Sequence, residues 1–266
     1  MNISPKYLAI LTLVAICGRA QIPTDLLQKT QEKYLRGDYM GAIVVLDRII
    51  ELHPNVGNGY ALRGMAKEKN GDTIGALVDY AEAIRLQPTE ANYYVMRGKL
   101  LAATDRHASA IRDFDKLIEL QPAQSESYMY RGNARVHTRD YPGALADFNK
   151  ALLFSPDKPE AYVWSVYTLR LMGSLSVALA RADETIKLFP THAEAYWQRS
   201  EVKVADTSNP SRVEAALTDL DEAIRLTPED ARYYKDRANL RSLSGDMDGA
   251  QADVNKYNEL TRPKKR

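Results

Sequence analysis

The prolines of this chain recur at a fixed interval. Most neighbours in the series are 34 residues apart, while the sixth follows after 38 and the seventh after 35. They are Pro54, Pro88, Pro122, Pro156, Pro190, Pro228 and Pro263. A period of this length marks a small structural unit that is repeated along the chain and that must cover its apolar face with its neighbours. The period therefore predicts a stack of seven units rather than one or two globular domains.

Each period contains two amphipathic helices, most clearly in residues 125–158. From Ala144 to Leu152, apolar residues recur three or four apart, as one buried helical face requires. Asp140 and the Tyr-Pro-Gly run after it separate this helix from the preceding one, and Pro156 ends it. The chain is therefore expected to be all-α and built of helical hairpins.

Other residue types keep step with the prolines when positions are numbered so that the proline is position 32 of its unit. Position 20 is alanine in all seven units: Ala42, Ala76, Ala110, Ala144, Ala178, Ala216 and Ala250. Position 4 is tyrosine in the last six units: Tyr60, Tyr94, Tyr128, Tyr162, Tyr196 and Tyr234. Position 8 is a small residue in most units, namely Gly64, Gly98, Gly132, Ser200 and Ala238, while unit five has Val166 there.

This pattern of tyrosine, two small residues and proline in 34 residues resembles the tetratricopeptide repeat. The resemblance covers Pro23 to Arg262 and implies a right-handed α-solenoid of seven helix-turn-helix hairpins. The expected units are 23–56, 57–90, 91–124, 125–158, 159–192, 193–230 and 231–262. Four extra residues lengthen the loop of the sixth unit, and residues 263–266 form a basic tail.

The turns and helix starts can also be assigned. Glycines stand at position 15, where the first helix should end and the chain should reverse: Gly37, Gly71, Gly173 and Gly245. Thr191 to Glu194 have the spacing of a capping box, and other first helices are expected to begin through Asn55, Thr89 and Asp157.

The first 20 residues differ from the repeats. Lys6 precedes an apolar run from Tyr7 to Cys17, and Gly18 to Ala20 supply the small residues of a cleavage site. This is typical of a secretory signal peptide cut before Gln21, and the run is short for a membrane span. We expect an exported protein, periplasmic or secreted, of a bacterium, without a membrane span in the mature chain.

An alternative keeps Cys17, the only cysteine, as the lipidated first residue of an envelope lipoprotein. Ile16 stands where a lipoprotein motif has a small residue, which favours removal of the leader. Cleavage before Gln21 leaves no thiol in the mature chain.

The repeats also carry paired charges. Position 7 is arginine and position 23 is aspartate in the same five units, while units one and five lack both. The pairs are Arg63 with Asp79, Arg97 with Asp113, Arg131 with Asp147, Arg199 with Asp219, and Arg237 with Asp253. Because the two residue types are present or absent together, we expect a structural salt bridge across each of these hairpins.

Little in the sequence indicates catalysis, a metal or a cofactor. The histidines His53, His107, His137 and His192 stand at unrelated positions of different units, and no phosphate loop or zinc spacing occurs. With 36 basic and 35 acidic residues, no global positive field favours nucleic acid. We expect neither enzymatic activity, a cofactor nor a nucleic-acid partner.

The resemblance implies that the first helices line a concave groove, with positions 2, 5, 9, 12 and 13 facing it. The expected binding residues are Met129, Asn133, Tyr167, Arg170, Trp197 and Glu201. Glu160 and Glu194 at position 2 add an acidic rim. The alternative for such side chains is packing between adjacent first helices.

The hypothesis for function is a non-catalytic scaffold or adaptor that holds a protein or peptide segment in this groove. The alternatives are an envelope-anchored accessory lipoprotein of an assembly or secretion complex, and an enzyme subunit. Partner identity and oligomeric state do not follow from the sequence.

Overall fold

The computed structural model describes residues 23–262, so the expected leader and basic tail lie outside the described residues. These residues form fourteen helices and no strand. They divide between Ala123 and Gln124 into two compact units, each made of several of the expected repeats.

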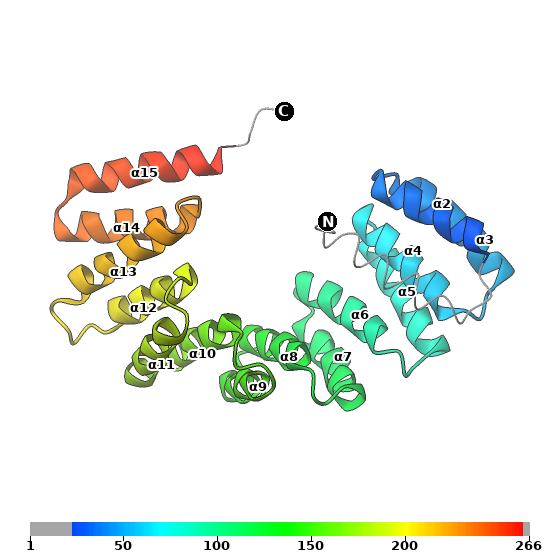
Figure 1. The fold of residues 1–266 in the computed structure, drawn as a ribbon, viewed down its shortest axis with the longest axis horizontal. Coiled ribbons are helices and arrows are strands. Elements are labelled where there is room, and N and C mark those ends of the chain that lie inside the picture. Colours follow the sequence, from blue (N-terminus) through cyan, green and yellow to red (C-terminus); the bar gives the residue numbers. More distant parts are fainter. Residues whose placement is uncertain (1–22, 263–266) are drawn as a thin grey trace. The chain divides into compact units, whose positions relative to one another are not determined.

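The first compact unit contains the first three repeats, each a helical hairpin, shown in blue to green in Figure 1. Its helices are α2 (Thr24–Leu35), α3 (Tyr39–Leu52), α4 (Gly57–Lys69), α5 (Thr73–Leu86), α6 (Ala91–Ala103) and α7 (His107–Leu120). Two helices fall in each of the expected repeats 23–56, 57–90 and 91–124.

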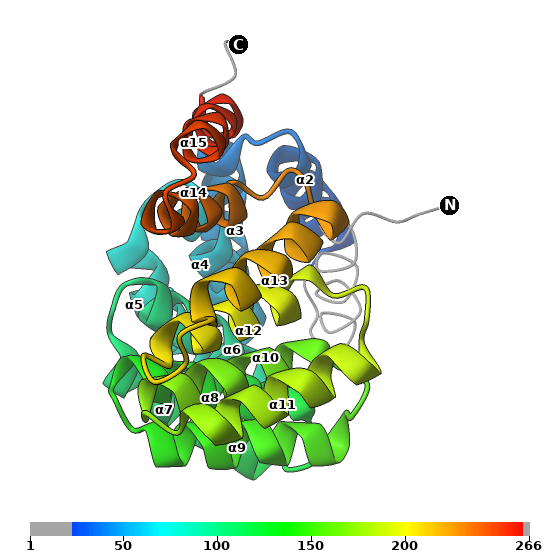
Figure 2. The same ribbon diagram turned by 90° about the vertical axis from the view of Figure 1, so that its left-hand side faces the viewer.

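The second compact unit contains the last four repeats, each a helical hairpin. Its helices are α8 (Ser125–His137), α9 (Tyr141–Phe154), α10 (Pro159–Leu171), α11 (Leu175–Leu188), α12 (Ala193–Ala205), α13 (Arg212–Leu226), α14 (Ala231–Ser244) and α15 (Met247–Thr261). The first helices α8, α10 and α12 lie along one side and the second helices α9, α11 and α13 along the other (Figure 1). Figure 2 shows α8 to α11 running alongside one another.

Each hairpin packs on the next one within its unit. Contacts join helices that follow each other in the chain, and the first helices α8, α10 and α12 also touch in turn. The core is therefore a series of similar interfaces, which is why the same residue types return every 34 residues.

Two of the recurring positions are explained by close packing inside the hairpin. The alanines Ala42, Ala76, Ala110, Ala144, Ala178 and Ala216 are fully buried. At position 8, a Cβ on Gly64 would lie 2.7 Å from Tyr80, and one on Gly132 would lie 2.7 Å from Phe148. The position-8 glycine therefore makes room for an aromatic ring at position 24 of the second helix.

The fifth repeat has the larger residue at position 8 and the smaller one at position 24. Val166 replaces the glycine and Ala182 replaces the aromatic residue, and both side chains are buried in one apolar cluster. The departure of this repeat from the pattern is thus compensated within the hairpin.

The repeated tyrosine and proline are linked by a hydrogen bond. The hydroxyl of Tyr94 donates to the carbonyl of Pro88 at 2.9 Å, and Tyr60, Tyr196 and Tyr234 make the same bond at 3.0–3.1 Å. This bond satisfies the proline carbonyl at the end of the preceding repeat and joins consecutive repeats.

The salt bridges predicted from the paired charges are confirmed in all five units. Nitrogen–oxygen distances are 2.6 or 2.7 Å in every pair, and each aspartate is almost fully buried. Unit five has Ser165 instead, whose hydroxyl donates to the Ala161 carbonyl at 2.7 Å. Its Arg181 lies over the ring of Tyr162 at 5.8 Å.

The turns inside the hairpins agree with the prediction from glycine. Gly37, Gly71, Gly173 and Gly245 have φ between +74° and +88°, the left-handed region that glycine enters without steric cost. Units three and four place Asp105 and Arg139 there, with φ of 58° and 62°. The insertion of unit six lies between α12 and α13, as expected.

The predicted caps of the first helices are wrong. Each N-cap lies one residue after the predicted one: Val56, Glu90, Lys158 and His192 replace Asn55, Thr89, Asp157 and Thr191. The side chains of Val56, Lys158 and His192 make no cap bond. Two other first helices have side-chain caps at residues that were not predicted: Glu90 caps α6 and Asp230 caps α14. Among the second helices, four are capped by an aspartate that accepts from a glycine N–H three residues later: Asp38, Asp72, Asp140 and Asp246.

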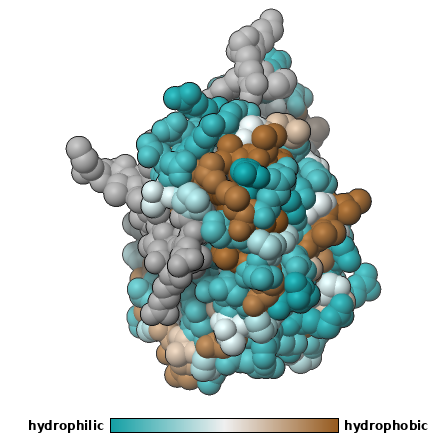
Figure 3. All heavy atoms as spheres, turned by 90° about the vertical axis from the view of Figure 1, so that its right-hand side faces the viewer, coloured by the Kyte–Doolittle hydropathy of each residue, from teal (hydrophilic) through white to brown (hydrophobic). Residues whose placement is uncertain are grey.

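Some apolar side chains remain exposed on the second helices of the first unit. Met40 and Val44 of α3 and Ile74 and Val78 of α5 are more than half exposed. Figure 3 shows apolar patches among hydrophilic ones on the side of the chain where α2 and α3 lie.

Candidate functional site

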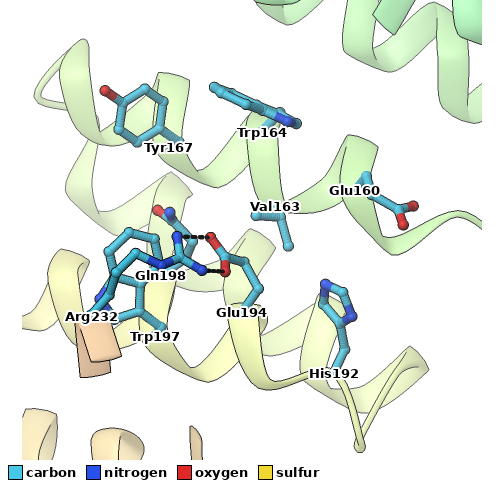
Figure 4. Close-up of a pocket in the computed structure, with 9 residues that line it drawn as sticks. All are labelled: Glu160, Val163, Trp164, Tyr167, His192, Glu194, Trp197, Gln198 and Arg232. Carbon is cyan, nitrogen blue, oxygen red and sulfur yellow. Dashed lines mark hydrogen bonds and ion pairs between the residues drawn. The ribbon is translucent and has the colours of Figure 1, made fainter. Parts of the chain in front are cut away.

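A cavity of about 420 Å³ opens on the first helices of the second unit. Helices α10, α12 and α14 and the residue before α12 supply its lining. The lining residues are Glu160, Val163, Trp164, Tyr167, His192, Glu194, Trp197, Gln198 and Arg232 (Figure 4). Glu160, Glu194 and Arg232 stand at position 2 of their repeats, Val163 and Trp197 at position 5, and Tyr167 at position 9. The repeat period therefore places equivalent residues of three successive hairpins around one cavity.

Helix α10 supplies an aromatic wall. Trp164 stacks on Phe148 of the preceding hairpin with ring centroids 6.2 Å apart, and meets Tyr167 edge-on at 5.6 Å. Both rings are partly buried against the cluster of Val136, Ala144 and Phe148. This packing holds the two aromatic side chains in place beside the cavity.

Helix α12 supplies the third ring. The indole N–H of Trp197 donates to Asp236 at 2.8 Å, which fixes the ring between α12 and α14. The guanidinium of Arg232 lies 4.7 Å from its ring centroid, and Figure 4 shows the two side chains together at the cavity edge. Trp197 therefore both packs between first helices and lines the cavity.

Charges at the cavity are mostly paired. Arg232 bonds to Glu194 at 2.8 Å and to Asp230 at 2.7 Å, and these bonds, the one to Asp230 foremost, raise the pKa of Arg232. The structure records no ion pair for Glu160 in the described chain, and this residue is exposed. With Glu194 already neutralised, Glu160 leaves the lining with a net negative charge.

Gln198 is the one lining residue with a buried side-chain polar atom that lacks a hydrogen-bond partner in the described chain. Its side chain is only 4% exposed, and Oε1 has no hydrogen-bond partner in the described part of the chain. An unpaired buried amide oxygen is costly, so a guest that donates a hydrogen bond to this amide would be stabilised there.

The structure brings two of the six predicted groove residues, Tyr167 and Trp197, into this cavity. Met129 packs against the same apolar cluster as Trp164 and Tyr167 and is not among the lining residues of this cavity. Asn133 is partly buried on α8 and is not among the lining residues of this cavity.

The other two predicted residues form an ion pair beside the cavity. Arg170 Nη2 lies 3.7 Å from Glu201, and its guanidinium lies 5.3 Å from the Tyr167 ring centroid. Burial raises the pKa of Glu201, while Arg170 opposes the shift.

Trp164, Gln198 and Arg232 were not predicted from the sequence as binding residues. Trp164 and Gln198 stand at position 6, which was not assigned to the groove. Arg232 stands at position 2 of unit seven, the unit that follows the acidic rim expected from Glu160 and Glu194. The sequence signal for Trp164 was its size, since other repeats carry no tryptophan at position 6.

Comparison with known proteins agrees with this architecture. Residues 95–161 match the family model described as tetratricopeptide repeat. A solved tetratricopeptide repeat protein from Parabacteroides merdae superposes on 91% of this chain and 94% of its own, with a TM-score of 0.74 and 19% identity. The chain has the tetratricopeptide-repeat fold.

Other solved tetratricopeptide-repeat structures are similar at low identity. The C-terminal part of a repeat protein from Cytophaga hutchinsonii covers 88% of this chain and 95% of its own, with a TM-score of 0.64 and 14% identity. YrrB, described as a TPR protein with an unusual peptide-binding site, covers 69% of this chain and 92% of its own, with a TM-score of 0.54 and 21% identity. No curated protein sequence matches the chain significantly.

No cluster of three or more histidine, cysteine, aspartate or glutamate side chains within residues 23–262 is placed to hold a metal ion. Over the same residues, no helix has the length and apolar character needed to cross a membrane.

Proposed function

We propose that this tetratricopeptide-repeat protein is a non-catalytic scaffold that holds a segment of a partner protein in the cavity on α10, α12 and α14. The observation that carries the proposal is the set of three aromatic rings around one open cavity, beside the unpartnered amide of Gln198. Aromatic side chains in such positions contribute much of the energy of protein interfaces. The peptide-binding site of YrrB, a protein of the same fold, is compatible with this role.

The lining indicates a segment with a cationic side chain. Faces of tryptophan and tyrosine rings attract ammonium and guanidinium groups, as Arg232 over Trp197 and Arg170 over Tyr167 already show within this protein. Glu160 is an exposed carboxylate without an ion pair among the described residues, and the Gln198 amide oxygen is an acceptor without a hydrogen-bond partner there. A lysine or arginine in the segment fits all three features.

The test is recovery of the partner from an extract of the source organism with the immobilised protein. Trp197→Ala should reduce recovery of the partner strongly, because a buried aromatic anchor contributes about 2 kcal/mol or more. Glu160→Lys should weaken the same partner by charge repulsion without disturbing the fold, since Glu160 is exposed.

Matched controls lie on second helices. Phe154→Ala removes a partly exposed aromatic residue of α9, and Glu214→Lys reverses an exposed charge on α13. Both controls should retain the partner. Equal recovery by Glu160→Lys and Glu214→Lys would exclude the cavity as the binding site.

Export is the second part of the proposal, and it rests on the leader pattern of residues 1–20. Mass spectrometry of the mature N-terminus distinguishes the alternatives. A first residue Gln21 supports a free exported protein, and a lipidated Cys17 supports the envelope-anchored form. An intact Met1 contradicts both.

A further inference from the structure

A second cavity, of about 340 Å³, lies in the first unit between α5, α6 and α7. It is separate from the cavity on α10, α12 and α14 and is positively charged. Its lining residues are Leu77, Ala81, Arg97, Leu101, Arg106, Ser109, Arg112 and Asp113. Three guanidinium groups against one carboxylate leave two positive charges in the lining.

The other repeats show what this cavity lacks. In three of them, the Nη1 group of the position-7 arginine bonds to an aspartate at position 25 of the preceding repeat. These bonds are Arg63 to Asp47 at 2.6 Å, Arg199 to Asp183 at 2.8 Å, and Arg237 to Asp221 at 2.7 Å.

At the cavity, the equivalent of this aspartate is Ala81. Arg97 bonds to Asp113 through Nε at 2.9 Å and Nη2 at 2.6 Å, and no partner is recorded for its Nη1 within residues 23–262. Ala81 itself lines the cavity. The cavity therefore occupies the place where three other repeats hold a carboxylate against the arginine.

A second carboxylate is missing at the same place. Four second helices begin with an aspartate cap and a glycine three residues later. Helix α7 has Arg106 and Ser109 at these positions, and no side chain caps its first turn. Arg106 therefore adds a positive charge where those repeats carry a negative one.

Arg112 completes the charge excess. Its Nη2 donates to the hydroxyl of Ser109 at 2.9 Å, and no ion pair is recorded for Arg112 or Arg106 in the described chain. Leu77 and Leu101 form an apolar part of the lining.

We propose that this cavity binds a phosphate group, held by Arg97, Arg106 and Arg112. A phosphate carries between one and two negative charges near pH 7 and several acceptor oxygens, which suits three guanidinium groups with a net excess of two charges. One oxygen would take the place that the position-25 aspartate occupies in the other repeats, against Arg97 Nη1.

The experiment is calorimetric titration of the purified protein with inorganic phosphate at constant ionic strength. Phosphate should bind, and Ala81→Asp should weaken it about tenfold or more, because the new carboxylate pairs with Arg97 as in the other repeats. The same variant should unfold at the same or a higher temperature, which separates loss of the site from loss of the fold. Arg112→Gln should also weaken phosphate binding.

Ala81→Asn is the matched control, because asparagine has the size of aspartate without its charge. It should retain phosphate binding better than Ala81→Asp does. Equal binding by both variants, absence of phosphate binding, or acetate binding as tight as phosphate binding would each overturn the proposal. Within the proposal, tighter binding of O-phosphoserine than of inorganic phosphate indicates a phosphorylated side chain as the source, and equal binding indicates free phosphate.

Discussion

At the scale of single residues, the buried aspartates are held by more cations than the sequence predicted. Position 11 of four repeats supplies a second basic residue one helical turn after the arginine. These residues are Lys67, Arg135, Lys203 and Arg241, at 2.7–3.0 Å from their aspartates. In unit three position 11 is Leu101, so Asp113 has Arg97 as its only recorded cation in the described chain. The aspartates are therefore not equally protected against loss of their arginine.

Arg97→Ala should destabilise the protein more than Arg63→Ala. Arg97→Ala leaves Asp113 buried with no cation, a change that costs about 3 kcal/mol or more. After Arg63→Ala, Asp79 keeps Lys67 at 2.9 Å, so the cost should be smaller although Arg63 makes more ion pairs. Urea unfolding of the two variants measures the difference.

The double replacement Arg97→Leu with Asp113→Leu is the control, since removing both charges leaves none unpaired. It should be less destabilising than Arg97→Ala. If Arg63→Ala proves the more harmful change, the second cation does not protect the aspartate as argued.

Glu201 gives a prediction that depends on pH. Burial raises the pKa of its carboxyl group above the ordinary value despite Arg170, so the folded state holds this proton more tightly than the unfolded state. Protonated Glu201 therefore contributes its full stabilisation of the folded state below the ordinary carboxyl pKa, and this contribution is lost as pH rises through the raised pKa. Glu201→Gln should raise the melting temperature at pH 7 and change it little at pH 4. An unchanged difference between the two pH values would show that Glu201 does not titrate in this way.

At the scale of helices and hairpins, the 34-residue period predicted the architecture well. A proline, a buried alanine and a turn residue each return once per repeat, so the number and placement of hairpins follow from the sequence. Helix starts were less accessible, because an aspartate before Tyr141 and a threonine before His192 both fit a capping pattern. Only the structure shows that Asp140 caps its helix and that Thr191 does not.

The size exchange at positions 8 and 24 gives a prediction for a whole hairpin. Gly98→Val should destabilise the protein by about 2 kcal/mol, because a Cβ at this position would lie 2.6 Å from the ring of Phe114. Adding Phe114→Ala should recover part of the loss, since the pair then matches Val166 and Ala182 of unit five. Melting temperatures of the two single variants and the double variant form the test. Simple additivity of the two costs would contradict size complementarity as the reason for the glycine.

Only part of the candidate site could be predicted from the sequence, because the repeat period determines which helix face a residue lies on but not how its side chain is oriented. The period places position 5 and position 9 on the same face of successive first helices, and this correctly brought Tyr167 and Trp197 together. It does not determine how long side chains cross between repeats. Arg232 reaches back over Trp197 to Glu194, and Trp164 turns from the Phe148 cluster toward the cavity. Such contacts depend on side-chain rotamers and helix packing, which a single sequence does not specify.

At the scale of the whole molecule, energy is distributed along the chain rather than gathered in one core. Helix pairs in contact are near neighbours in sequence within each compact unit. An interior helix is covered by the hairpins before and after it, whereas a helix at the end of the array lacks one of these neighbours. The burial follows this rule, because Thr30 is the only buried residue of α2 and α15 buries only Ala250 and Asp253.

The rates of amide hydrogen exchange should therefore differ between the end helices and the interior helices of each compact unit. Opening an end helix breaks one interface, whereas opening α4 or α10 exposes many buried side chains on both sides. Amides of α2 should exchange faster than those of α4, and amides of α15 faster than those of α10, when followed by mass spectrometry at residue or peptide level. Low concentrations of urea should accelerate exchange in α10 more steeply than in α15, because its opening exposes more surface. Equal rates and equal urea dependence in α10 and α15 would mean that the second unit opens only as a whole, and the local distribution of stability argued from its contacts would be wrong.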